Sequence, residues 1–303
     1  MKYRHIFHAG NFADLHKHLT WMVLLQAMQR KEKGFLVVDT HAGSGFYDLR
    51  SAEAKQSAEA SINLLPAIVT QDASAPATES GALQLYMTTL DSLRRAATLT
   101  NGYPGSPVWS LSQLRPQDRM VCFEVQPAEH RQLEKNLAKL AKALSTQSLA
   151  RIKTRCADGY AELAAWLPPI ERRALILIDP PYENSDQDYK AIATALTTIM
   201  SRFSQAVIAL WYPIKHRADT ERALGRLLSS LSTCKGLPQT PESLRCELWR
   251  HPCDSKVGLN GSGMLVINPP WQVEECLRAS LPSLYAALDE RGTGGWQVIG
   301  TPQ

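Results

Sequence analysis

The stretch Ala174-Leu-Ile-Leu-Ile-Asp-Pro-Pro-Tyr-Glu183 decides the fold. Its first five residues are apolar without a break, which is typical of a central strand buried on both faces. Asp179 ends this run, and Pro180-Pro181 then holds the backbone extended and removes two donors of ladder hydrogen bonds. An acid at the carboxyl end of such a strand points into the crevice where open α/β sheets bind ligands. The stretch therefore predicts an α/β fold with a ligand site beside Asp179.

The residue types after the strand suit chemistry on an exocyclic amine of a nucleobase. Asp-Pro-Pro-Tyr at this position resembles the signature of methyltransferases that modify such an amine. The carboxylate of Asp179 can accept one N6–H of adenine and the carbonyl of Pro180 the other, which holds the nitrogen as it attacks a methyl sulfonium. Tyr182 offers a ring on which the target base can stack. We expect one-step transfer from S-adenosylmethionine, without a metal or a covalent intermediate.

A second strand signal, Phe35-Leu-Val-Val-Asp39, precedes the turn Thr40-His-Ala-Gly-Ser-Gly45. Gly43 and Gly45 allow positive φ and a close approach of the backbone to a ligand. The third glycine of the dinucleotide fingerprint is missing, which argues against a nicotinamide dehydrogenase. The spacing D-x-x-x-G-x-G instead favours the cofactor turn of S-adenosylmethionine enzymes.

Two further acids follow predicted strands. Glu124 ends Val121-Cys-Phe-Glu124, and its carboxylate can accept from both ribose hydroxyls of the cofactor. Asp158-Gly159 lies beyond the short strand Arg151–Cys156, where an acid in this fold contacts the adenine amine. Between the first turn and Glu124, residues 48–100 read as helical, and we expect them to form a small inserted helical subdomain. The methyltransferase domain would then comprise residues 1–47 and 101–303.

Composition sets broad limits on the class of protein. The chain has 303 residues, 44% of them hydrophobic and 20% charged, which is ordinary for a globular protein. A net charge of +4 is compatible with a nucleic-acid partner without requiring one. The six cysteines show no C-x-x-C pair, and no apolar run approaches the length of a membrane span. These features predict a reduced, cytoplasmic protein without a membrane segment.

The N-terminal segment contains four histidines in its first eighteen residues. Asn11 can cap a helix that continues to about Glu32 and ends before Gly34. Its buried face would be formed by apolar residues at helical spacing: Leu15, Leu19, Met22 and Val23. Because carboxylate and thiolate ligands are scarce nearby, we expect a basic segment that faces RNA rather than a metal site, with a solvated polar edge as the alternative.

A second string, Asn268-Pro-Pro-Trp271, also follows an apolar strand and would also suit an amine methyltransferase. It comes after the fifth strand signal, Ala206–Trp211, whereas catalysis in this fold occurs beside the cofactor loop, at the fourth. We therefore expect Asp179 to be the catalytic acid. Asn268 is expected to begin the terminal antiparallel hairpin region with Leu244–Trp249.

Taken together, the motifs identify a family. The chain resembles the bacterial 23S rRNA (adenine-2030-N6)-methyltransferase family over nearly its whole length. The motifs that carry the resemblance occur in order: Tyr3-Arg-His-x-Phe-His-Ala-Gly-Asn11, Lys17-His18, Asp39-Thr-His-Ala-Gly43, Tyr103-Pro-Gly-Ser-Pro107, Ile178-Asp-Pro-Pro-Tyr-Glu183, Leu210-Trp-Tyr-Pro213, Ser262-Gly-Met264 and Asn268-Pro-Pro-Trp271.

The resemblance implies a Rossmann-like methyltransferase fold with a mostly parallel seven-stranded sheet. It implies a catalytic carboxylate at Asp179 and a substrate-side role for Tyr3. It also implies S-adenosylmethionine contacts at His18, His41, Ser106, Glu124, Asp158 and Gly159.

The expected partner is 23S rRNA with a bulged, junction or single-stranded adenine, bound by a monomer that uses no metal. Candidate phosphate contacts are Arg4, Lys17, Lys215 and Arg217. Two alternatives remain open: another amine target, namely DNA adenine or rRNA guanine N2, and a non-catalytic RNA-binding protein.

Overall fold

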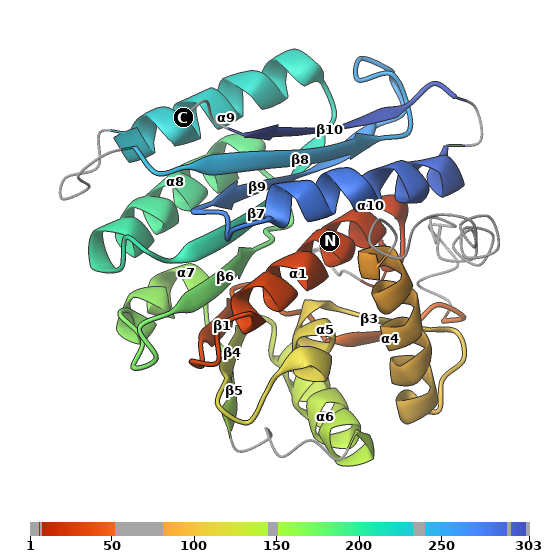
Figure 1. Cartoon of the computed structure of the whole chain (residues 1–303), viewed down its shortest axis with the longest axis vertical. Coiled ribbons are helices and arrows are strands. Elements are labelled where there is room, and N and C mark those ends of the chain that lie inside the picture. Colours follow the sequence, from red (N-terminus) through yellow and green to blue (C-terminus); the bar gives the residue numbers. More distant parts are fainter. Residues whose placement is uncertain are drawn as a thin grey trace.

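The computed structural model describes residues 6, 8–51, 81–144, 151–232, 240–289 and 292–300. In this part of the chain an eight-stranded sheet carries helices on both faces, as Figure 1 shows. The strands are, in order across the sheet, β10 (Gly295–Gly300), β8 (Ser243–Trp249), β9 (Gly261–Ile267), β7 (Val207–Ile214), β6 (Ala174–Ile178), β1 (Leu36–Asp39), β4 (Arg119–Phe123) and β5 (Ile152–Arg155).

The five strands from β7 to β5 are parallel, and β6 lies near the middle of the whole sheet. All five residues of β6 are buried, so the strand predicted from the apolar run is confirmed. After β1 the chain goes to β4 on one side, and it later returns to β6 on the other. Such a reversal of strand order opens a crevice at the carboxyl ends of the strands, where ligands bind in open α/β sheets.

The remaining three strands are antiparallel to their neighbours. The prediction of seven strands is wrong by one, because β10 extends the sheet. Only Val298 of β10 is buried, and glycines stand at both of its ends, so its sequence lacks the apolar pattern of a core strand. Pairing with β8 nevertheless covers an edge that would otherwise expose unpaired backbone groups.

The helices form a layer on each face of the sheet, each with its own apolar core. One layer contains α1 (Phe12–Gln29), α4 (Gly81–Ala97), α5 (Ser106–Gln113), α6 (Pro127–Ala143) and α10 (Val273–Leu288). The other contains α7 (Gly159–Glu162), η5 (Leu163–Trp166), α8 (Ser185–Arg202) and α9 (Arg217–Ser232). None of the described helices is both long and apolar enough to cross a membrane.

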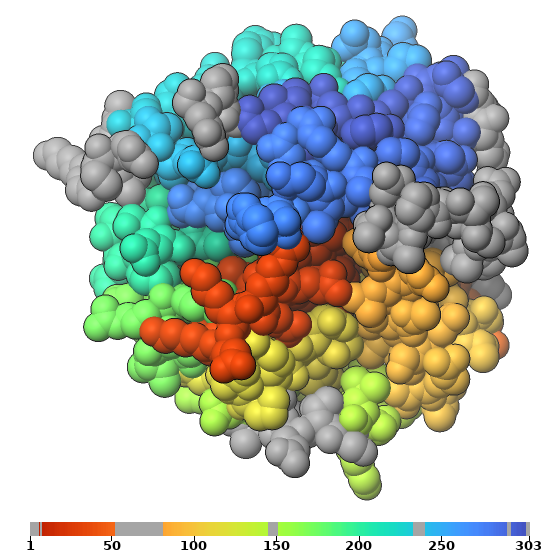
Figure 2. Space-filling model, viewed as in Figure 1, coloured from red at the N-terminus to blue at the C-terminus, as the bar shows by residue number. Residues whose placement is uncertain are grey.

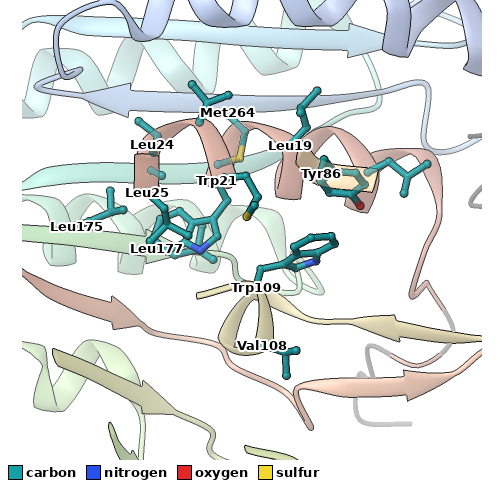
Figure 3. Packing of buried hydrophobic residues seen from close by; sticks show 14 of the residues in the cluster. Leu19, Trp21, Leu24, Leu25, Tyr86, Val108, Trp109, Leu175, Leu177 and Met264 are labelled. Carbon is teal, nitrogen blue, oxygen red and sulfur yellow. The ribbon is translucent and has the colours of Figure 1, made fainter. Parts of the chain in front are cut away.

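Helix α1 lies at the centre of its layer. The side chain of Asn11 caps it by accepting from the Asp14 backbone N–H at 3.0 Å, as the sequence predicts, but the helix ends at Gln29, three residues before Glu32. Neighbouring segments from the C-terminal part of the chain and from α4 and α5 enclose it (Figure 2). Trp109 of α5 stacks on Tyr86 of α4, with ring centroids 4.4 Å apart, and Trp21 of α1 belongs to the same apolar core (Figure 3). Almost the whole circumference of α1 is therefore buried, and not one face alone.

This burial corrects one prediction. His16, Lys17 and His18 are all at most 3% exposed, so this part of the histidine-rich segment does not face RNA. His16 bonds the Ser262 hydroxyl through Nδ1 at 2.9 Å, and burial lowers its pKa to about 4. The histidine is therefore a neutral packing residue between α1 and the sheet.

Most of the predicted insertion, residues 52–80 with the apolar segment Ile62–Leu65, lies outside the described residues. At its ends, β2 (Phe46–Asp48) and β3 (Gly102–Pro104) pair as a two-stranded antiparallel sheet. Helix α4 packs into the same apolar core as α1. A division into two domains stays a prediction.

Candidate active site

Four acids lie where the parallel strands end, on one side of the sheet. Asp179 follows β6, Asp39 ends β1, Glu124 follows β4 and Asp158 lies three residues beyond β5. These strands are parallel neighbours, so their carboxyl ends meet at the same edge. The arrangement brings the predicted catalytic acid and the predicted cofactor acids to a common crevice.

Lys17 anchors the predicted catalytic carboxylate. Its Nζ lies 2.5 Å from Oδ2 of Asp179 and 2.8 Å from Oδ1 of Asp14. The other oxygen of Asp14 accepts from the Gly10 backbone N–H at 3.0 Å. Burial lowers the pKa of Lys17, but the two carboxylates outweigh this effect and raise it, so the side chain stays charged. The prediction that Lys17 contacts phosphate is therefore wrong, because the amine is buried and doubly paired.

Asp179 keeps one oxygen for another partner. Only Oδ2 is bonded to a described residue, and the side chain is 11% exposed. The following Pro180 is buried. An immobile carboxylate oxygen at the crevice can accept a hydrogen bond from a substrate amine without further reorganisation.

Tyr182 is fixed more tightly than a surface ring would be. Its hydroxyl donates to the carbonyl of Trp211 at 2.7 Å, and the residue is 5% exposed. Its φ of +52° is a left-handed conformation that a bulky residue adopts only where the surroundings impose it. The ring also lies 5.3 Å from that of Tyr189. The role of Tyr182 in stacking the target base stays a prediction.

The glycine turn after β1 has the predicted backbone conformation. The φ angles of Gly43 and Gly45 are +59° and +77°. The Gly43 N–H donates to Oε2 of Glu124 at 2.9 Å, and the Gln126 N–H donates to Oε1 at 2.7 Å. Burial raises the pKa of Glu124, and these two backbone bonds partly offset that rise. The carboxylate is thus oriented from two sides beside the turn.

Asp39 links the turn to α5. Its Oδ2 accepts from the hydroxyl of Ser106 at 2.7 Å, and its Oδ1 accepts from the His41 backbone N–H at 3.2 Å. The carboxyl group is fully buried, and burial raises its pKa to about 6. Ser106, expected to contact the cofactor, therefore also has a structural partner that the sequence did not indicate.

The raised pKa of Asp39 predicts a pH-dependent contribution to stability. A buried carboxyl that binds its proton more tightly when folded adds stability at low pH, and this is lost as the pH rises from about 4 to about 6. We expect Asp39→Asn to remove this dependence, worth about 3 kcal/mol from a shift of roughly two pH units. Urea unfolding of both proteins between pH 4 and 7 measures it. A constant difference between the two would contradict the assignment.

The far side of the crevice is formed by His41 and the start of α7. Burial lowers the pKa of His41 to about 4, more than Asp179 and Asp158 raise it, so the ring is neutral. Its Nδ1 bonds the hydroxyl of Thr40 at 2.8 Å. Asp158 is exposed and caps α7, accepting from the Tyr160 backbone N–H at 2.8 Å. His41 and Asp158 thus lie close to the same space as Asp179.

Gly159 packs directly against the turn that follows β1. A Cβ there would lie 2.4 Å from the carbonyl oxygen of Thr40 and 2.8 Å from its Cα, both backbone atoms. We expect Gly159→Ala to displace the turn that holds His41, to destabilise the fold by about 1–3 kcal/mol and to weaken cofactor binding. Thermal unfolding and calorimetric titration with S-adenosylmethionine measure the two effects.

Gly225 offers a matched control, because a Cβ there meets nothing within 4 Å and the residue lies within α9. Gly225→Ala should stabilise the protein by about 0.5–1 kcal/mol through helix propensity alone. Equal responses of the two variants would mean that the approach of Gly159 to Thr40 has no importance.

The remaining predicted site residues fall into two groups. His18 is buried, with its Nδ1 2.7 Å from the hydroxyl of Tyr103 and its ring between Tyr103 and Trp109. Its contact with the cofactor stays a prediction. Tyr3 and Arg4 lie outside the described residues. Within the described ranges, no three His, Cys, Asp or Glu side chains gather so that they could hold a metal ion.

Asn268 lies at the opposite end of the strands, where the parallel strand β7 begins. It follows β9, which is antiparallel to β7, and its side chain donates to the carbonyls of Ser204 and Ala206, just before β7 begins. Position therefore favours Asp179 over Asn268, as the sequence predicts. The expectation that Asn268 begins a hairpin is wrong, because β8 and β9 form that hairpin before it.

Comparison with known proteins decides the family. The profile of the family described as "Ribosomal RNA large subunit methyltransferase D, RlmJ" matches residues 32–300. The chain belongs to this family. Among RlmJ relatives, "Ribosomal RNA large subunit methyltransferase J" of Escherichia coli is 36% identical over 97% of this chain and 96% of its own length. The protein of the same name from Haemophilus influenzae is 34% identical over 98% of both chains.

A solved structure shares the RlmJ-family fold. The crystal structure of protein LPL1258 from Legionella pneumophila matches this chain with a TM-score of 0.76 and 30% sequence identity. The match covers 96% of this chain and 98% of that one. This chain and the Legionella protein therefore share one fold.

Proposed function

We propose that this protein transfers a methyl group from S-adenosylmethionine to the exocyclic N6 amine of one adenine in 23S ribosomal RNA. As a member of the RlmJ family it is an S-adenosylmethionine-dependent methyltransferase of large-subunit rRNA. The choice of adenine N6 is supported by one observation above all. The carboxylate of Asp179 is held by Lys17 at the same sheet edge as the Gly43–Gly45 turn.

The residues on the cofactor side are suited to S-adenosylmethionine. At Gly43 the positive φ of +59° and the Tyr47 hydroxyl, which would lie 2.2 Å from a Cβ, both require glycine, and this preserves the shape of the turn. Glu124, oriented by two backbone N–H groups, would accept from the ribose hydroxyls. Asp158, the N-cap of α7, would accept from the adenine amine. When bound, S-adenosylmethionine supplies an activated methyl group on its sulfonium.

The protein's contribution to the reaction is position and electrostatics. Oδ1 of Asp179 and the carbonyl of Pro180 would accept the two N–H groups of the target amine, which fixes the direction of its lone pair. The neutral His41 adds no positive charge beside the sulfonium. Tyr182 would support the flipped base through its ring.

Methyl transfer with labelled S-adenosylmethionine tests the proposal. Unmodified transcripts of 23S rRNA and double-stranded DNA are offered separately, and the products are digested to nucleosides. We expect label in N6-methyladenosine from RNA alone. Label in N2-methylguanosine or in DNA adenine would replace the proposed target, and no transfer to any nucleic acid would favour a non-catalytic RNA-binding protein.

We also propose that the protein acts as a monomer in the cytoplasm, where its rRNA substrate is made. All four acids of the crevice and the lysine that pairs with Asp179 come from one chain. Sedimentation of the purified protein with and without rRNA tests the oligomeric state, and a dimer would contradict it.

A further inference from the structure

A groove with a volume of about 700 Å³ runs between α8 and α9, on the face of the sheet opposite α1. It is separate from the cofactor turn, but it shares one residue with the candidate active site. Tyr182 of the Asp-Pro-Pro-Tyr motif and Pro213 at the end of β7 line its inner end. A ligand that fills the groove would therefore contact the predicted base-stacking residue.

Basic side chains predominate along this groove. Lys190 of α8, Lys215 before α9, and Arg222 and Arg226 on α9 line it, against two acids, Asp186 and Asp219. Arg222 is paired with Asp219. Among the described residues none forms an ion pair with Lys190, Lys215 or Arg226, and all three are exposed. The groove thus presents three cations that no described residue neutralises through an ion pair.

The spacing of these groups suits an extended polyanion. Arg222 and Arg226 are four residues apart, so they lie one above the other on α9. From its first residue, Arg217, to Arg226, α9 rises roughly 14 Å, and Lys215 lies just before this stretch. The ring of Tyr189, 5.3 Å from that of Tyr182, also lines the groove and adds an aromatic surface among the cations. Cations that follow a backbone beside rings that stack bases are the common features of sites for single-stranded nucleic acid.

We propose that this groove binds the RNA strand that flanks the target adenine. Phosphates would pair with Lys190, Lys215 and Arg226, and a neighbouring base would stack on Tyr189. This inference rests on the proposed function, since the base held at Asp179 fixes where the strand enters. A regular duplex would keep that base in its stack, so the groove is expected to bind the strand in unpaired form.

The test neutralises the three free cations together, in the variant K190Q/K215Q/R226Q. We expect the KM for a 23S rRNA transcript to rise roughly 10- to 100-fold, with kcat within about 2-fold of wild type. The slope of log affinity for a labelled single-stranded RNA against log salt should fall by about 2, since each lost phosphate contact removes about 0.7. Affinity for S-adenosylmethionine should not change.

The matched control is R131Q/K135Q/K142Q on α6, which removes three exposed cations from the other helix layer. A control variant with the same rise in KM, or a groove variant with wild-type KM and salt slope, would overturn the proposal. The binding measurement needs no methyl transfer. If the proposed function itself failed, wild-type protein would not methylate rRNA, yet the salt slopes of the two variants would still decide whether the groove binds RNA.

Discussion

Asp179→Asn is expected to lower kcat for rRNA methylation about 100- to 1000-fold, while the affinity for S-adenosylmethionine changes by less than about 2-fold. Lys17 donates to Oδ2 of Asp179 and leaves Oδ1 for the substrate. An asparagine has one oxygen and one NH₂ group. If its oxygen accepts from Lys17, its NH₂ faces the target amine. Both of these groups donate hydrogen bonds, so neither can accept from the other. If its oxygen faces the amine, its NH₂ opposes the lysine.

Single-turnover methylation with saturating enzyme measures this loss without interference from product release. Calorimetric titration with S-adenosylmethionine shows whether the cofactor site is intact. Asp254→Asn, at an exposed position in the loop between β8 and β9, is the control and should retain full activity. If Asp179→Asn methylates at the wild-type rate, the carboxylate has no part in the mechanism. If the variant instead loses its affinity for S-adenosylmethionine, Asp179 belongs to the cofactor site and not to the substrate site.

The sequence predicted the centre of the site because its members end buried strands. Gly43, Glu124 and Asp179 each follow an apolar run, and parallel strands bring their carboxyl ends together wherever they pair. The pairing order itself could only be inferred from the fold class. Strand β10 was missed because one buried residue in six gives no alternation to detect.

The environment of Lys17 could not be predicted in the same way. Asp14 lies three residues before it, which is a local signal on a helix, but Asp179 is 162 residues away. From sequence, a lysine between two histidines indicates a polar surface. Tertiary packing places α1 between the sheet and three other helices, so these polar residues are buried and do not form a polar surface.

Lys17→Met is expected to have the second large effect. It removes the cation between two carboxylates and leaves both in surroundings that are mostly closed to water. Breaking such a buried pair destabilises a protein by about 3–5 kcal/mol. We also expect kcat to fall about 10- to 100-fold. Without the amine, the carboxylate of Asp179 is no longer fixed at the position from which it would accept the hydrogen bond of the substrate.

A second variant separates the loss of the contact between Lys17 and Asp179 from a loss of folding. Lys17→Met combined with Asp14→Asn removes one of the two carboxylates that would otherwise be left without a cation. The asparagine oxygen can still accept from the Gly10 N–H. Urea unfolding should show that part of the stability returns. Activity should stay low, because Asp179 still lacks its partner. If activity instead recovers in proportion to stability, Lys17 only holds α1 in place, and the carboxylate of Asp179 needs no cation beside it.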